Sequence, residues 1–233
     1  MTSSVWSALG NTYVVVEPDP GRPLDPEQVQ ALVGDTNGIV EVVSTGQGDM
    51  SIVIWNPDGS QAELSGNGTR IAAAWLAERS GARRISVRVG AREIDARVLE
   101  NGDIEQDLGD VHVGPREVVA GTAFIPVSVG NPHAVVVGDP DEIERVGPLL
   151  ETHPRFPNRT NVQVVRIDGP GEVTARVWER GVGETSSSGT SAVAVAAATH
   201  GVGEVVVHFP GGDLRVRLEN GRAHLTGPAE RSR

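Results

Sequence analysis

The sequence contains no cysteine and no lysine. None of its 233 residues is Cys, and all 20 basic residues are Arg. The lack of cysteine excludes disulfide bonds, thiolate metal ligands and a cysteine nucleophile. The lack of lysine excludes a Schiff base on a lysine amine, and with it ordinary pyridoxal-phosphate chemistry.

Long apolar runs and excess positive charge are also absent. No stretch of 18 apolar residues could span a bilayer, and no charged segment followed by an apolar one opens the chain. The formal net charge of −11 disfavours nucleic acid and anionic membranes as partners. The six histidines are scattered without ligand spacing, so we expect no metal site. We therefore expect a soluble, cytoplasmic protein that binds a small molecule, and a homodimer is left open.

One pattern occurs twice, about half a chain apart. The first copy spans 61–70 and the second spans 183–191, and each has a Glu, a Ser-Gly turn and a Thr before an Ala-rich run. The pattern predicts one helix beginning after Ser65 and another after Ser188. Bare amides at a helix N-terminus bind carboxylates and phosphates. Serine is also a favoured N-cap, so helix capping alone is the alternative explanation.

The remaining pattern alternates strands and helices in two similar halves, which predicts an α/β (α+β) protein. We expect two lobes, 1–117 and 118–233. Whether the last strand pairs within the C-terminal lobe or returns to the N-terminal lobe is left open. Both Ala-rich helices are apolar nearly all round, so each should be buried inside the sheet of its own lobe. Two further helices are expected at 25–33 and 141–151. Strands are expected at 13–16, 38–43, 50–55, 84–89, 93–99, 103–108, 124–129, 134–137, 161–167, 172–178, 204–209, 214–218 and 222–225.

Polar residues gather where the expected strands end. Taken singly, each Asn among them is typical of a turn. Together with two helix N-termini they could line a site for a small zwitterion, because amides and an Arg hold carboxylates while a Glu meets an ammonium. The residues are Asn11, Asn56, Asn131, His133, Asn161, Glu179 and Arg180.

Several segments, in this order, resemble the diaminopimelate epimerase family over almost the whole chain. The most distinctive are Gly-Asn-Pro-His at 130–133 and Glu-Arg-Gly-Val-Gly-Glu-Thr at 179–185. The others are Gly10-Asn11, Asn56-Pro57-Asp58-Gly59-Ser60, Ser65-Gly66-Asn67-Gly68-Thr69-Arg70, Asn161-Val162 and Ser188-Gly189-Thr190.

The resemblance implies two pseudo-symmetric lobes, each a curled and mainly antiparallel sheet around a central buried helix. It implies an epimerase without cofactor or metal that interconverts LL- and meso-diaminopimelate by two-base α-proton transfer, on the route to lysine and peptidoglycan. Positions 65 and 188 would carry the two proton-transferring groups, supported by His133 and Glu179. The substrate-binding residues would be Asn11, Asn56, Gly66, Asn67, Asn131, Asn161, Glu179, Arg180, Gly189 and Thr190.

The departure from the family falls on the reaction itself. The family's two bases are cysteines, and the matching positions here are Ser65 and Ser188. An alcohol has a pKa near that of water and far above the value of about 8.5 for a thiol, so forming the anion costs ~8 kcal/mol more. A neutral serine can still relay a proton if another group takes it, and Glu63, Glu184, His133 and Glu179 are the candidates. Three hypotheses remain: a working epimerase, a homologue that binds an amino acid without turnover, and a same-fold isomerase with a carboxylate base.

Overall fold

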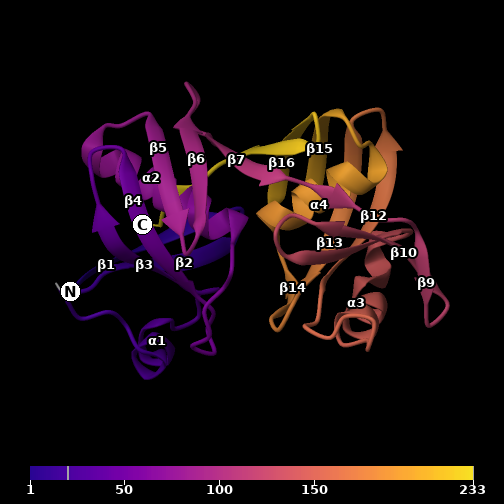
Figure 1. Ribbon diagram of the computed structural model, residues 1–233, viewed down its shortest axis with the longest axis horizontal. Coiled ribbons are helices and arrows are strands. Elements are labelled where there is room, and N and C mark those ends of the chain that lie inside the picture. The colour runs from indigo at the N-terminus through magenta and orange to yellow at the C-terminus, as the bar shows by residue number, and fades with distance from the viewer. Residues whose placement is uncertain (20, 233) are drawn as a thin grey trace. The chain divides into compact units, whose positions relative to one another are not determined.

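The computed structural model describes residues 1–19 and 21–232. The chain divides into two units (Figure 1). Unit 1 is Met1–Asp107 with Thr226–Arg233, and unit 2 is Leu108–Leu225. The boundary at 117/118 that the sequence suggested thus lies inside unit 2, and the chain returns to unit 1 after Leu225.

Unit 1 holds two helices and most of the N-terminal strands. The helices are α1 (Pro26–Leu32) and α2 (Gly66–Ser80). The strands are β1 (Thr2–Ala8), β2 (Asn11–Glu17), β3 (Ile39–Thr45), β4 (Asp49–Trp55), β5 (Arg84–Val89), β6 (Arg92–Val98) and β18 (Glu230–Arg231). Two strands, β7 (Ile104–Asp110) and β17 (Arg222–Gly227), are each divided between the units.

Unit 2 holds the remaining elements. Its helices are the short 3-10 helix η1 (Pro140–Glu142), α3 (Ile143–Glu151) and α4 (Gly189–Thr199). Its strands are β8 (His112–Val113), β9 (Glu117–Val119), β10 (Thr122–Ser128), β11 (Pro132–Val137), β12 (Asn161–Gly169), β13 (Glu172–Glu179), β14 (Gly183–Thr185), β15 (Gly203–Phe209) and β16 (Gly212–Glu219).

The two units repeat one topology. In unit 1 the antiparallel pairs β1–β2, β3–β4 and β5–β6 are joined by the parallel pairs β2–β3 and β4–β5. In unit 2 the antiparallel pairs β10–β11, β12–β13 and β15–β16 are joined by the parallel pairs β11–β12 and β13–β15. Each parallel pair needs a crossover, and a helix supplies it: α1 and α2 in unit 1, α3 and α4 in unit 2. The internal repeat that the sequence suggested is confirmed in the strand pairing.

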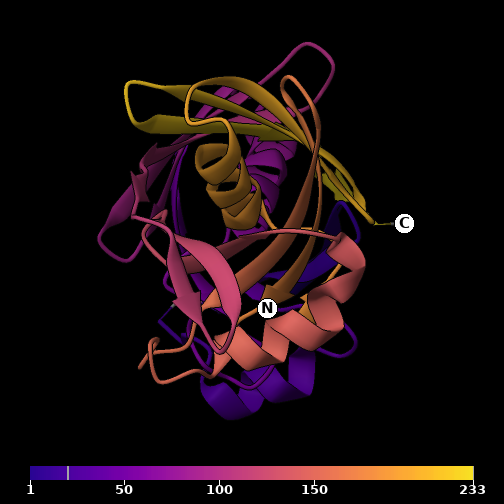
Figure 2. The same ribbon diagram turned by 90° about the vertical axis from the view of Figure 1, so that its right-hand side faces the viewer.

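The second helix of each repeat is the centre of its unit. Within unit 1, α2 contacts β1 to β6, and within unit 2, α4 contacts β10 to β13, β15 and β16. Figure 2 shows α4 enclosed by strands, with α3 on the outer side of the sheet. Residues Gly66–Leu76 of α2 and Gly189–Ala197 of α4 are buried. Helices that are apolar all round belong inside a core, so the prediction of two buried helices is confirmed.

The sequence signals that begin and end the helices act as expected, with one exception. Asp25 and Gln28 form a capping box at α1, and Gly81 ends α2 in the left-handed conformation at φ 72°. The helix expected at 141–151 is wrong at its start. Asp139 accepts a hydrogen bond from Asp141 N–H, and with Pro140 it begins the tight turn η1, so α3 proper begins at Ile143.

Candidate active site

Ser65 occupies the N-terminus of α2 as a true helix cap. Its backbone is extended (φ −134°, ψ 118°), and its Oγ accepts a hydrogen bond from Gly68 N–H at 3.0 Å. Tyr13 from β2 reaches the same oxygen, with 3.1 Å between the two hydroxyl oxygens. The capping explanation therefore holds for Ser65, but capping does not use all of its bonding capacity.

Arg70 and Asn67 stabilise this helix start from inside unit 1. The Arg70 side chain is fully buried, its Nε donates to Pro228 O at 2.9 Å, and its Nη2 donates to Asn67 Oδ1 at 3.0 Å. Burial lowers the pKa of Arg70 to about 10, so the guanidinium stays charged at neutral pH. The Asn67 oxygen is thus used in fixing Arg70, although sequence reasoning placed Asn67 in the substrate site.

Two other predicted residues of unit 1 lie at strand ends, as expected, and a third lies at the start of α2. Asn11 is buried at the start of β2, opposite Ala8 of β1. Asn56 follows β4, and its amide Nδ2 donates to Ser60 Oγ at 2.9 Å within one turn. Gly66 is the first residue of α2 and contributes a backbone amide there.

Ser188 precedes α4 in the same extended conformation (φ −149°, ψ 128°), but it is not a cap. Within the described residues its side chain makes no capping hydrogen bond to the helix. It makes a hydrogen bond to the carboxyl group of Glu179 instead. The Ser188 hydroxyl is therefore directed to a carboxyl group, whereas the Ser65 hydroxyl is directed to a helix amide and a phenol.

Glu179 is a half-buried acid beside two hydroxyl groups at the end of β13. Thr185 Oγ1 donates to its Oε1 at 2.6 Å, and β14 pairs Gly183 with Glu179. Burial raises the pKa of Glu179, while the hydrogen bonds from Thr185 and Ser188 act in the opposite direction. A carboxylate whose pKa is raised toward neutrality is a better general base than an ordinary surface Glu.

His133 is buried in a hydrogen-bond network beside the start of α4. Its Nε2 is 2.9 Å from Asn131 Oδ1, and its Nδ1 is 3.0 Å from Gln163 Nε2. Burial, followed by the charge of Arg180, lowers the pKa of His133 to about 3. Gln163 can only donate through Nε2, so the imidazole is neutral with its proton on Nε2.

The network connects His133 to the first turn of α4. Asn131 Nδ2 donates to Thr190 Oγ1 at 3.3 Å, and Gln163 Nε2 also donates to Ser191 Oγ at 2.9 Å. Both ring nitrogens of His133 are engaged in holding Asn131 and Gln163. In the structure, His133 therefore holds Asn131 in position. The sequence analysis had expected His133 to assist one of the proton-transferring groups.

Asn161 and Arg180 complete the group in unit 2. Asn161 Nδ2 donates to Pro132 O at 3.0 Å, and its Oδ1 accepts from Arg180 N–H at 3.0 Å. The register explains this proximity, because His133 of β11 pairs with Asn161 of β12, and Val162 pairs with Trp178 of β13. Three strand ends thus meet near one helix N-terminus, where Gly189 is the first residue of α4.

Sequence reasoning missed three residues that the structure adds: Tyr13, Gln163 and Thr185. Thr185 lies within the segment 179–185 that the sequence analysis had already singled out. Its position in the same segment as Glu179 was a signal from which its role could have been predicted. Tyr13 and Gln163 had no such signal, because each reaches its partner from a strand that is distant in sequence.

Among residues 1–19 and 21–232, no three His, Asp or Glu side chains come together as metal ligands. Within that same part of the chain, none of the helices is long and apolar enough to cross a membrane.

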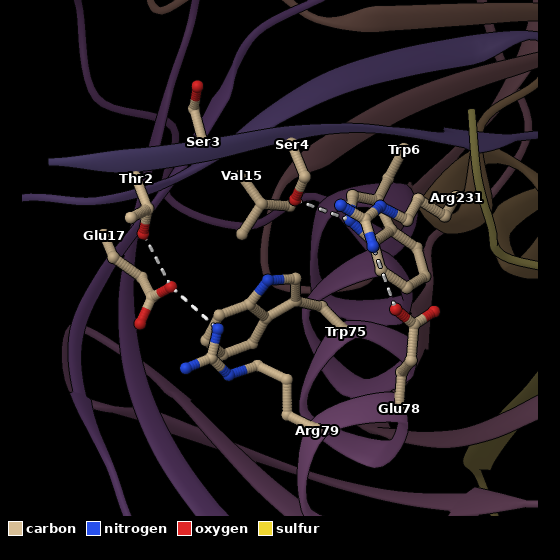
Figure 3. Close-up of a pocket in the computed structure, with 10 residues that line it drawn as sticks. All are labelled: Thr2, Ser3, Ser4, Trp6, Val15, Glu17, Trp75, Glu78, Arg79 and Arg231. Carbon is tan, nitrogen blue, oxygen red and sulfur yellow. Dashed lines mark hydrogen bonds and ion pairs between the residues drawn. The ribbon is translucent and has the colours of Figure 1, made fainter. Parts of the chain in front are cut away.

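A pocket of about 330 Å³ in unit 1 lies apart from these residues (Figure 3). It is at the C-terminal end of α2, whereas Ser65 is at the N-terminal end. Arg79 lies 4.7 Å over the Trp75 ring and pairs with Glu17 at 2.9 Å, and Arg231 pairs with Glu78 at 3.4 Å. Its basic groups are thus neutralised by its own acids.

Comparison with known proteins decides the family. The model of the family "Diaminopimelate epimerase" matches residues 125–231. The diaminopimelate epimerase of Carboxydothermus hydrogenoformans is 34% identical over 95% of this chain and 94% of its own length. That of Desulforudis audaxviator is 36% identical over the same shares. This chain belongs to the diaminopimelate epimerase family.

Solved structures with the same fold extend beyond the diaminopimelate epimerase family. A protein described as a predicted epimerase from Pseudomonas aeruginosa superposes with a TM-score of 0.74 at 15% identity, covering 99% of this chain and 96% of that one. A hydroxyproline epimerase from Agrobacterium vitis superposes with a TM-score of 0.71 at 14% identity, covering 99% and 88%. These likenesses confirm the fold that the resemblance implied.

Proposed function

We propose that this protein is an epimerase that interconverts LL- and meso-diaminopimelate without a cofactor. The substrate is inferred from the relatives named above. Those relatives are diaminopimelate epimerases, and they align with nearly the full length of this chain. The observation that carries it is the hydrogen bond between Ser188, at the N-terminus of α4, and the half-buried carboxyl group of Glu179.

Glu179 lets Ser188 act as a base without being deprotonated beforehand. Deprotonation of Ser188 before reaction is too costly, since its pKa is near that of water. In a relay, Ser188 Oγ takes the α-proton while its own proton passes to the Glu179 carboxylate, so no alkoxide forms. The Cα–H bond breaks, and its electron pair passes to the adjacent carboxylate to form an enediolate. The α-proton is then on Ser188 Oγ, and the former Ser188 proton is on Glu179.

The helix N-terminus would stabilise the charge that develops on the substrate. The first amides of α4, beginning at Gly189, have no partner within the helix and carry partial positive charge. Fixed amides of this kind act on an anion at no cost in reorganisation. Inversion then requires a second proton donor for the opposite face of the carbon, and the Ser65 hydroxyl at α2 has the corresponding place in the repeat.

The test is the ratio of the stereoisomers. Purified protein is incubated with LL-diaminopimelate, and the LL and meso forms are separated by chiral chromatography. We expect approach to a mixture of both, and a loss of the rate by a factor of about 100 or more in Ser188→Ala. The double variant Ser65→Cys with Ser188→Cys should raise the rate by orders of magnitude. Tight binding of diaminopimelate without conversion in any variant would overturn the epimerase assignment in favour of an amino-acid-binding protein.

A further inference from the structure

The Ser65 hydroxyl has a partner that no motif indicated. Tyr13 Oη lies 3.1 Å from Ser65 Oγ, although the residues are 52 apart in sequence. The Tyr13 side chain is buried, and Gly38 of the adjoining segment makes room for it: a Cβ at Gly38 would lie 2.9 Å from the ring carbon Cε1. The phenol is thus held at the N-terminus of α2 by packing.

A donor role for Tyr13 fits the bonding capacity of Ser65, although either hydroxyl can donate in this contact. A serine oxygen accepts two hydrogen bonds and donates one. Ser65 Oγ accepts from Gly68 N–H, and if Tyr13 donates as well, both acceptor positions are filled. The Ser65 proton is then free to be given to another molecule. Ser188 is arranged in the opposite sense, because an ionised Glu179 can only accept, so Ser188 donates to it and keeps its lone pairs.

We propose that Tyr13 is the proton partner of Ser65 in the epimerisation, as Glu179 is of Ser188; the inference rests on the proposed function. The Ser65 O–H bond breaks as the new Cα–H bond forms, and the Tyr13 proton moves to Ser65 Oγ. A Tyr13 phenolate remains, and it is reprotonated by solvent or by a substrate of the opposite configuration reacting in reverse.

Arg70 supplies the charge that such a phenolate needs. It stays protonated at neutral pH, and its charge interacts with Tyr13 as well as with Asp103. An adjacent cation favours the ionised form of an acid. Both residues are buried, where charge interactions are stronger than in water.

The experiment uses Tyr13→Phe, which keeps the ring and removes only the hydroxyl. Each isomer is incubated in D2O with the wild type and the variant, and both α-deuteration and inversion are followed. In the variant we expect inversion to fall about 100-fold or more, while deuteration without inversion remains measurable through Ser188 and Glu179.

A pH profile separates a proton role from a packing role. Tyr13 is the only tyrosine of the chain, so tyrosinate absorbance reports its ionisation directly. We expect the alkaline limb of the wild-type rate to follow that titration and to be absent in Tyr13→Phe. Equal inversion rates in wild type and Tyr13→Phe would overturn the role of Tyr13 and leave the epimerase intact. A wild type that neither deuterates nor inverts diaminopimelate would show instead that the proposed function has failed.

Discussion

His133 makes the folded protein sensitive to acid, and the size of the effect follows from its burial. A histidine in the unfolded chain has a pKa near 6.5, whereas that of folded His133 is lowered to about 3. Between these values the unfolded state binds a proton that the folded state does not, so stability falls as the pH falls. From pH 7.5 to pH 5 the loss is about 2 kcal/mol, at 1.36 kcal/mol for each pH unit below 6.5.

Urea unfolding of the wild type and His133→Gln at both pH values isolates this contribution. The variant removes the imidazole and should lose about 2 kcal/mol less than the wild type over the same interval, whatever its stability at pH 7.5. His112→Gln, at an exposed position on β8, is the matched control and should keep the wild-type slope. Equal slopes for the wild type and His133→Gln would refute the buried, neutral imidazole and the network built on it.

Three further predictions concern single residues. Ser65→Ala should cost about 1 kcal/mol in urea unfolding because it removes a helix cap; Ser188→Ala should cost less, and equal costs would contradict the difference between the two serines. Gly147→Ala should cost about 1–3 kcal/mol in the same assay, since a Cβ there would lie 2.6 Å from Trp178; an unchanged midpoint would contradict that packing. Glu179→Gln should lower epimerisation about 100-fold or more, measured against Glu184→Gln, whose carboxylate pairs with Arg176 at 2.6 Å; similar losses in both would argue against the relay.

The central helices and the internal repeat could be predicted because their signals are local. Ser65 and Gly81 stand at the two ends of α2, and an Ala-rich run between them has no polar face. The first strand was missed because its sequence carries no such local signal. Thr2–Ala8 is rich in Ser, and its turn to β2 places Leu9 at φ 52°, a conformation that nothing in the side chain favours.

The proton partners were only partly accessible from sequence. Glu179 was among the candidates, because it lies in a recognisable segment close to Ser188. The choice between Glu179 and His133 could not be made, since it depends on which buried groups face each other across strands β11 to β13. Tyr13 was predicted only as a strand residue, and its contact with Ser65 arises from the packing of β2 against α2.

The most direct test of the account is α-proton exchange in D2O, followed by the NMR signal of the α-CH of diaminopimelate. The account predicts deuteration by the wild type, a rate reduced about 100-fold or more in Glu179→Gln, and a near wild-type rate in Glu184→Gln. Wild-type exchange that persists unchanged in Glu179→Gln would contradict the serine–carboxylate relay. An absence of exchange in the wild type, with diaminopimelate bound, would contradict the epimerase function itself.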